Sequence, residues 1–174
     1  MHVPDGFINA SVSAATGVIS FGTLWAYIRS ASSLIADKFI ALTGMMTALI
    51  FVLQMINFPV AAGTSGHLLG GALAVIVLGP RLGLICLSVV VIIQSLLFAD
   101  GGLSALGINV MNMAIVTSVT AWVVVKYWIK FIGKTSSSLI IVSVLSGIIS
   151  VVFSSIAFMA VSYTHLTLPT NDRV

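Results

Sequence analysis

The stretch LGLICLSVVVIIQSLLF, residues 82–98, has no charged side chain and no strand-like alternation of polar and apolar residues. A run of roughly 20 apolar residues has the length of a helix that spans a bilayer. A helix also satisfies its own backbone hydrogen bonds where no water is present. We therefore predict a transmembrane helix here, and the same reasoning extends to the chain on either side.

The whole chain has the composition of a membrane protein. Of its 174 residues, 59% are hydrophobic and 6% are charged, and the mean hydropathy is +1.22. An average soluble domain carries about 25% charged residues. The single cysteine, Cys86, lies in an apolar run, which argues against a disulfide framework or a cysteine-rich metal cage. Residues 1–28 are not expected to be a secretory signal, because they lack a basic start and their apolar part is too long.

Six hydrophobic segments predict an all-α, polytopic membrane helix bundle with about six transmembrane helices. They cover residues 8–28, 39–57, 66–79, 82–98, 105–126 and 137–160. The third segment is short for a bilayer and ends at Gly79-Pro80, so we expect a short, tilted or partly re-entrant helix there. Residues 1–160 form one membrane-embedded domain in this interpretation.

The basic residues predict the orientation of the bundle. The first, third and fifth connections carry all of those that precede the tail: Arg29, Lys38, Arg81, Lys126, Lys130 and Lys134. The second connection, near residues 57–66, and the fourth, residues 100–102, carry none. The positive-inside rule makes the basic side cytoplasmic. The N-terminus, His67, Asp5 and Asp100 are then all predicted to face the outside of the cell membrane.

The first two residues, Met1 and His2, offer three nitrogens close together: the α-amine, the His2 amide and the imidazole Nδ1. The amine has an ordinary pKa of about 8. Ni(II) and Cu(II) displace the amide proton best, since they favour square-planar nitrogen fields. The next residues, Val3 to Gly6, predict a tight turn that folds this end back over the chain. His67, which follows the flexible loop 63–66, is the predicted fourth donor.

Simpler interpretations compete with this hypothesis. A start codon followed by a chance histidine would give the same two residues, and a lone histidine at a membrane helix end is more often interfacial than a ligand. The predicted topology favours ligation because it places His2 and His67 on one face. Asp100 either caps a turn or orients a ligand imidazole. Asp5 is first of all a turn residue.

Other polar residues are candidates for the surroundings of the metal. Asn109 and Asn112 share a predicted helix face near the outer end, where they either hydrogen-bond across helices or close the site. The full set of candidate surrounding residues is Asp5, Thr64, Ser65, Asp100, Asn109 and Asn112.

Residues 161–174 do not continue the hydrophobic pattern. They are polar and resemble a translated sequencing adapter joined to a broken gene. We therefore expect a non-native tail outside the fold, and a natural protein that continues past Ala160.

Five motifs resemble the CbiM/NikM family. They are MHVPDGF (residues 1–7), QMINFP (54–59), GTSGHLLGG (63–71), FADGG (98–102) and NVMNM (109–113). This family comprises the substrate-binding S components of cobalt and nickel energy-coupling-factor transporters, and the GTSGH form is more similar to the nickel-type members. The resemblance covers residues 1–160. It implies Ni(II) or Co(II) as substrate, held by the Met1 amine, the His2 amide and imidazole, and a histidine that matches His67, with no other tightly bound cofactor.

The resemblance also implies partners and a mode of action. The expected partners are a transmembrane coupling (T) protein, a pair of ABC-type ATPases and often a small accessory membrane protein, with no nucleic acid. Family members usually have a seventh helix, which would lie beyond the start of the tail. The expected protein is not an enzyme, since its partners hydrolyse the ATP. The alternatives are an accessory or structural subunit without a metal site, and a membrane enzyme that uses His2 and His67 as acid and base.

Overall fold

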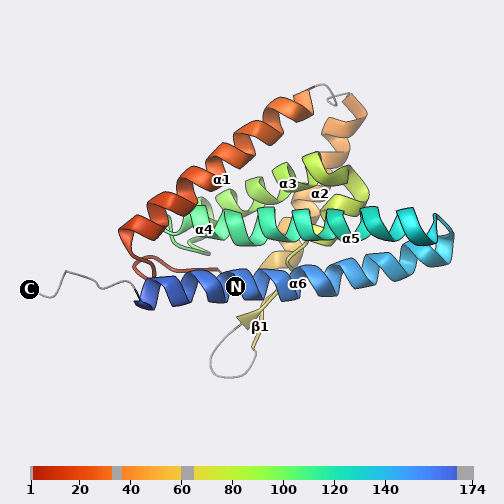
Figure 1. The fold of residues 1–174 in the computed structure, drawn as a ribbon. Helices are drawn as coiled ribbons and strands as arrows, with labels where there is room; N and C mark the ends of the chain where they lie inside the picture. Colours follow the sequence, from red (N-terminus) through yellow and green to blue (C-terminus); the bar gives the residue numbers. More distant parts are fainter. Residues whose placement is uncertain (1, 33–36, 60–64, 168–174) are drawn as a thin grey trace, which may run out of the picture.

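The computed structural model describes residues 2–32, 37–59 and 65–167, which are almost entirely helical. The elements in chain order are α1 (Ala10–Ala31), α2 (Asp37–Met55), β1 (Phe58–Pro59), β2 (Ser65–Gly66), α3 (Gly71–Phe98), α4 (Leu106–Val110), the π-helix η3 (Met111–Val116), α5 (Thr117–Ile132) and α6 (Ser136–Thr167). Helices α4, η3 and α5 follow one another without a loop and lie beside α6 (Figure 1). The all-α membrane fold that the sequence predicts is confirmed.

Several of these helices have the length and composition of membrane spans. Within the described residues, four stretches qualify: α1, α3, Leu106–Ile132 and Ser136–Val161, with Phe39–Met55 of α2 as a shorter apolar helix. Large apolar side chains point outward from them; Val18, Leu97 and Phe131 are 74–75% exposed. An exposed apolar surface of this kind suits contact with lipid chains rather than water.

Helix α3 combines the third and fourth predicted segments, and a break divides it. Gly79 has φ 79° and ψ 171°, which suits glycine, and Pro80 lacks the amide hydrogen needed to continue the helix. A Cβ on Gly83 would lie 2.9 Å from backbone atoms of Ala74 and Val75, whereas residues nine apart in a straight helix are about 13 Å apart. The two pieces therefore fold back on each other, and the short third segment is a half-length helix, as expected.

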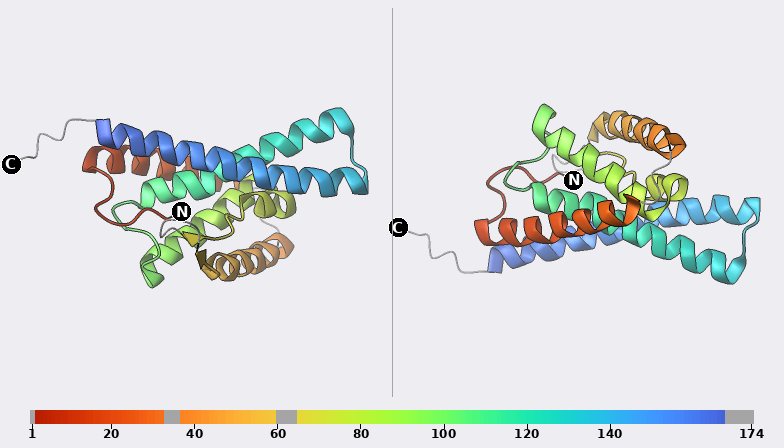
Figure 2. Two further views of the ribbon diagram at one scale, coloured as in Figure 1. Left: turned by 90° about the horizontal axis from the view of Figure 1, so that it is seen from below. Right: turned by 90° about the horizontal axis from the view of Figure 1, so that it is seen from above.

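The first helix crosses α4 at a pair of glycines, and this crossing fixes where the N-terminal segment lies. A Cβ on Gly107 would meet the Gly17 backbone nitrogen at 2.4 Å, so only small residues allow the approach. Ser20 Oγ donates to the Gly107 carbonyl at 2.7 Å across the same crossing. The N-terminal segment consequently lies beside α4 and the loop that follows α3 (Figure 2).

The last helix runs further than expected. Helix α6 continues to Thr167, past residue 160, where we expected the last segment to end. The physical reason is that no glycine or proline interrupts the sequence between 160 and Pro169, so polar residues simply extend a helix that is already formed. Residues 168–174 lie outside the described part of the chain.

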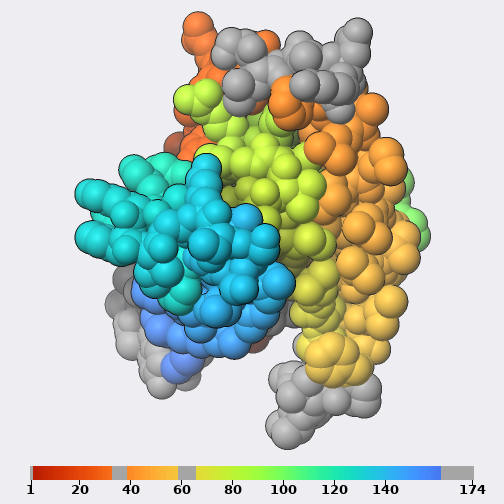
Figure 3. Space-filling view, turned by 90° about the vertical axis from the view of Figure 1, so that its right-hand side faces the viewer, coloured from red at the N-terminus to blue at the C-terminus, as the bar shows by residue number. Residues whose placement is uncertain are grey.

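The connections gather at opposite ends of the bundle. Arg81 and its Gly79-Pro80 corner share the wall of a cavity of about 380 Å³ with Tyr27 of α1 and Trp122 of α5. The N-terminal segment instead lies against the loop that follows α3, at the other end of that helix. This separation agrees with the predicted division between basic connections and histidines. Helix α2 lies along one side of α3, with α5 and α6 on the other (Figure 3).

Candidate metal site

The structure brings His2 and His67 together from distant parts of the chain. Their ring centroids are 5.0 Å apart, and the ring planes are inclined by 21°, so the two imidazoles are stacked. His2 begins the segment that leads into α1, and His67 lies between β2 and α3. Met1, the other predicted ligand, lies outside the described residues. The close approach of the two histidines is what the predicted topology requires.

The backbone next to His2 is held by the start of α4 and the loop before it. The Val3 amide donates to Asn109 Oδ1 at 2.8 Å, and Asn109 Nδ2 donates back to the Val3 carbonyl at 3.1 Å. The Gly102 amide donates to the same carbonyl at 2.8 Å. Val3 is 2% exposed, in a small apolar cluster. The asparagine that we considered for closing the site therefore clamps the segment that carries His2.

Two glycines in the FADGG motif make room for this segment. A Cβ on Gly102 would lie 2.3 Å from the Asp5 backbone nitrogen. A Cβ on Gly101, which has φ 102°, would lie 2.9 Å from Asn109 Nδ2 and 3.3 Å from His2 Cδ2. Cβ atoms do not approach backbone as closely as residue 102 would require, and the positive φ at residue 101 favours glycine. Residues 101–102 therefore suit the N-terminal segment because they lack side chains.

Asp5 anchors the far side of the same turn. Its Oδ1 accepts hydrogen bonds from the Ser104 amide at 2.7 Å and from the Ser104 hydroxyl at 2.6 Å. These bonds lower the pKa of Asp5, because they stabilise its charged form. The structural interpretation of Asp5 as a turn residue is thereby extended, since its side chain ties the turn to the loop before α4.

Asp100 lies directly beside His2. Its Oδ1 is 3.1 Å from His2 Nδ1, and the His2 side chain is only 7% exposed. Burial lowers the pKa of His2 to about 4, although the Asp100 charge acts in the opposite direction. Burial also lowers the pKa of His67. Both imidazoles are therefore neutral at pH 7, which is the state that binds a metal ion.

A cluster of buried polar atoms surrounds His2. The atoms without a hydrogen-bond partner within the described part of the chain include His2 Nε2, Asp100 Oδ2, Ser95 Oγ and both amide atoms of Gln94. His2, Ser95 and Asp100 line one cavity of about 600 Å³, and Gln94 lies beside His2 without a well-formed hydrogen bond. Buried polar groups are nearly always paired, so this cluster is suited to a polar or charged ligand. We missed Ser95 and Gln94 as site residues; their signal was polarity within residues 82–98.

His67 is presented by the turn of residues 67–70. Its Nδ1 lies 2.9 Å from the Leu68 carbonyl, which makes Nδ1 the protonated nitrogen and leaves the electron pair on Nε2. The Leu69 carbonyl accepts a hydrogen bond from Gln54 Nε2 at 2.7 Å. The turn closes at Gly70, whose φ of 81° favours glycine. Gln54 therefore contributes to this turn, a role that its position in an apolar segment did not reveal.

Asn112, another predicted residue, bonds to a different helix. Asn112 accepts hydrogen bonds from Ser154 Oγ at its Oδ1 (3.1 Å) and its carbonyl (3.2 Å), which joins η3 to α6. Thr64 lies outside the described residues, and Ser65 is part of β2. The described residues hold no group of three or more His, Cys, Asp or Glu side chains that could bind a metal. A site built from an amine, an amide and two imidazoles would not form such a group.

Comparison with known proteins places the chain in a family. The family model CbiM, described as the cobalt uptake substrate-specific transmembrane region, matches residues 2–170. The chain belongs to the CbiM family. The match extends into residues 161–170, which we had assigned to the tail.

Its relatives in this family are named as metal transport proteins. A putative fused nickel transport protein NikMN of Archaeoglobus fulgidus is 47% identical over 67% of the chain and 38% of its own length. A putative metal transport protein of Methanocaldococcus jannaschii is 33% identical over 79% of the chain and 62% of its own length. The chain thus spans less than two thirds of these relatives. A crystal structure of a transition metal transporter superposes with a TM-score of 0.85 at 25% identity, covering 99% of this chain and 74% of the other.

Proposed function

We propose that this protein captures Ni(II) or Co(II) as the substrate-binding component of a metal uptake transporter. The ligands are the Met1 amine, the His2 amide and imidazole, and the His67 imidazole. The single observation that supports this most is the stacked pair of imidazoles, with centroids 5.0 Å apart, from segments that are 65 residues apart in the chain. Membership of the CbiM family and the nickel and cobalt transport names of its relatives agree with it.

The spacing of the two rings fits the corners that the chelate assigns them. In a chelate by residues 1 and 2 the amide nitrogen is central, so the amine and the His2 imidazole lie opposite each other. His67 must then occupy the corner next to the His2 imidazole. With a metal–nitrogen bond of about 2.0 Å, imidazole centroids at neighbouring corners lie roughly 4.5 Å apart, and at opposite corners roughly 6.5 Å. The observed 5.0 Å is close to the neighbouring arrangement.

The His2 ring must turn to complete this chelate. The chelate uses Nδ1, and in the structure Nδ1 faces Asp100 at 3.1 Å. A half-turn about the Cβ–Cγ bond releases Nδ1 and moves Nε2 to the ring position next to the one that now contacts Asp100. The carboxylate, whose Oδ2 has no partner among the described residues, can then accept the Nε2–H bond. Asp100 would thus orient the bound imidazole, a common arrangement for metal ligands.

An acid–base enzyme fits these imidazoles less well. A general acid or base works best when its pKa lies near the operating pH. The pKa of His2 is about 4, and that of His67 is also lowered. We therefore assign the pair to metal binding. Energy for transport would come from partners, a T protein and an ABC-type ATPase pair, with the metal site at the outer face of the cytoplasmic membrane.

The decisive experiment alters the N-terminus alone. Adding one residue before Met1 moves the amine away from His2 and should abolish high-affinity nickel binding, while the thermal unfolding temperature should stay unchanged. Isothermal titration of the untagged and extended proteins with Ni(II) and Co(II) measures this. Metal analysis after growth with both ions then distinguishes nickel from cobalt. Equal nickel affinity of the two proteins would rule out the amine as a ligand.

A further inference from the structure

We propose that Gln54 of α2 is a positioning residue for the metal site, which holds His67 against His2 through the Leu69 carbonyl. This inference rests on the proposed metal-binding function, and it adds a residue and a helix to it. Gln54 is fully buried in the last turn of α2, and its Nε2 donates to the Leu69 carbonyl at 2.7 Å.

The bond controls the turn that presents His67. His67 and Leu69 are two residues apart, and the turn ends at Gly70 before α3 begins. A Cβ on Gly70 would lie 2.8 Å from a methyl group of Ile50 in α2 and 3.3 Å from Leu87 in α3. The turn is therefore packed between α2 and α3. The hydrogen bond from Gln54 fixes the position of the turn along the axis of α2.

The chemistry of Gln54 argues for a specific role. Its Oε1 is buried and has no hydrogen-bond partner within the described residues. A buried amide with only its NH₂ group paired is a poor choice for packing alone, since an apolar side chain of similar length would avoid the unpaired oxygen. The donated bond to the turn is thus the feature of Gln54 that packing does not explain.

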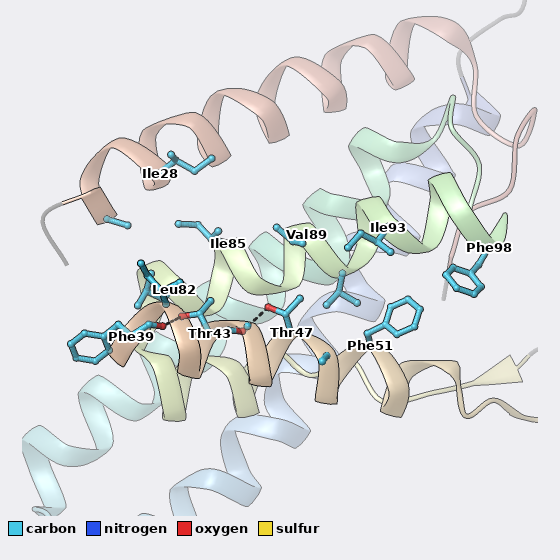
Figure 4. A pocket seen from close by; sticks show the side chains of 15 residues that line it. Ile28, Phe39, Thr43, Thr47, Phe51, Leu82, Ile85, Val89, Ile93 and Phe98 are labelled. Atoms are coloured by element: carbon cyan, nitrogen blue, oxygen red, sulfur yellow. Dashed lines mark hydrogen bonds between the residues drawn. The ribbon is translucent and has the colours of Figure 1, made fainter. Parts of the chain in front are cut away.

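Helix α2 is well placed to transmit its position to the site. It packs chiefly against α3. An apolar cavity of about 790 Å³ lies between α1, α2 and α3 (Figure 4). Two threonines of α2 face this cavity. Thr43 and Thr47 donate to carbonyls of their own helix, and Thr47 also contacts Cys86 Sγ of α3 at 3.2 Å, so none of these bonds reaches α1. A displacement of α2 would therefore reach His67 through Gln54, while the segment that carries His2 stays bound to α4.

The test is a double-mutant cycle on the full chain in nanodiscs. Gln54→Met keeps the side-chain length and removes the donor. It should lower the Ni(II) affinity roughly 10- to 100-fold, the usual range for groups that orient a ligand. In the His67→Ala background the same change should have no further effect, because it acts through His67. Thr43→Val, which removes a hydroxyl that bonds to the Phe39 carbonyl of the same helix, away from the turn, is the matched control and should leave the affinity unchanged.

A metal-free measurement keeps the inference separate from the proposed function. Amide hydrogen exchange over residues 66–71 should become faster in Gln54→Met but not in Thr43→Val. If the wild type binds no metal, the proposed function fails while the exchange still tests the positioning role. Unchanged exchange, an unchanged affinity of Gln54→Met, or an equal loss with and without His67 would each overturn the inference.

Discussion

The two halves of the site are built differently. The His2 half is tied to the loop before α4 and to Asn109 by the backbone of Val3 and the side chain of Asp5. Helix α4 continues directly into η3 and α5. The His67 half is a short turn, joined to α2 by the side chain of Gln54. Two buried hydrogen bonds between the Asn109 side chain and the Val3 backbone hold the segment that carries His2. The position of His67 depends on a helix beside an apolar cavity. In the proposed site, one half is therefore fixed, and the other half follows α2.

The largest effect on metal binding should come from displacing the N-terminal segment that carries His2. Gly102→Val places a Cβ 2.3 Å from the Asp5 backbone nitrogen, so the N-terminal segment must leave its position against residues 101–102. We expect no measurable Ni(II) binding by isothermal titration. Gly147→Val is the matched control, because a Cβ on Gly147 of α6 meets nothing within 4 Å. If Gly102→Val bound nickel as the control does, the packing of the N-terminal segment against Gly102 would be irrelevant to the site.

Removing His67, the metal donor in the other half of the site, should lower the Ni(II) affinity by less. His67→Ala leaves the three nitrogens of residues 1 and 2 in place, so binding persists but weakens by more than the roughly 100-fold upper range for an orienting group. The visible absorption of bound Ni(II) should also shift, since water or buffer replaces an imidazole. Titration and absorption spectra of the same sample measure both. An unaltered spectrum would show that another group supplies the fourth donor.

Much of this arrangement follows from the sequence, for physical reasons. Long apolar runs predict helices in a bilayer because no other local structure satisfies the backbone there. The basic loops predict which ends meet, so His2, His67 and Asp100 could be placed together without a structure. The predicted end of the last helix at residue 160 was wrong, because polar residues do not by themselves stop a helix. Helix α6 continues to Thr167.

The roles of single polar residues were harder to predict. Asn109 and Asn112 share a sequence motif, yet Asn109 clamps Val3 whereas Asn112 bonds to Ser154 of α6. Helical spacing shows that two residues share a face, but not which neighbouring element each one meets. In the sequence, only their polarity within apolar segments distinguishes Gln54 and Gln94. The Leu69 carbonyl that Gln54 contacts and the His2 ring beside Gln94 lie in segments whose paths depend on the whole fold.

The smallest effect should come from neutralising the neighbour of His2. Asp100→Asn keeps an oxygen that can accept the imidazole N–H bond and removes only the charge. Burial lowers the pKa of His2 to about 4, and the Asp100 charge partly offsets this by stabilising the imidazolium. Without that charge the pKa of His2 should fall further, so the ring stays neutral to a lower pH. The metal affinity should decrease about 10-fold, the lower end for an orienting group. An NMR titration of the metal-free protein from neutral to acidic pH follows the ring, and nickel titration at pH 7 follows the affinity. An upward shift of the His2 pKa would contradict the contact with Asp100, and a loss of affinity as large as that of His67→Ala would make Asp100 a ligand rather than a support.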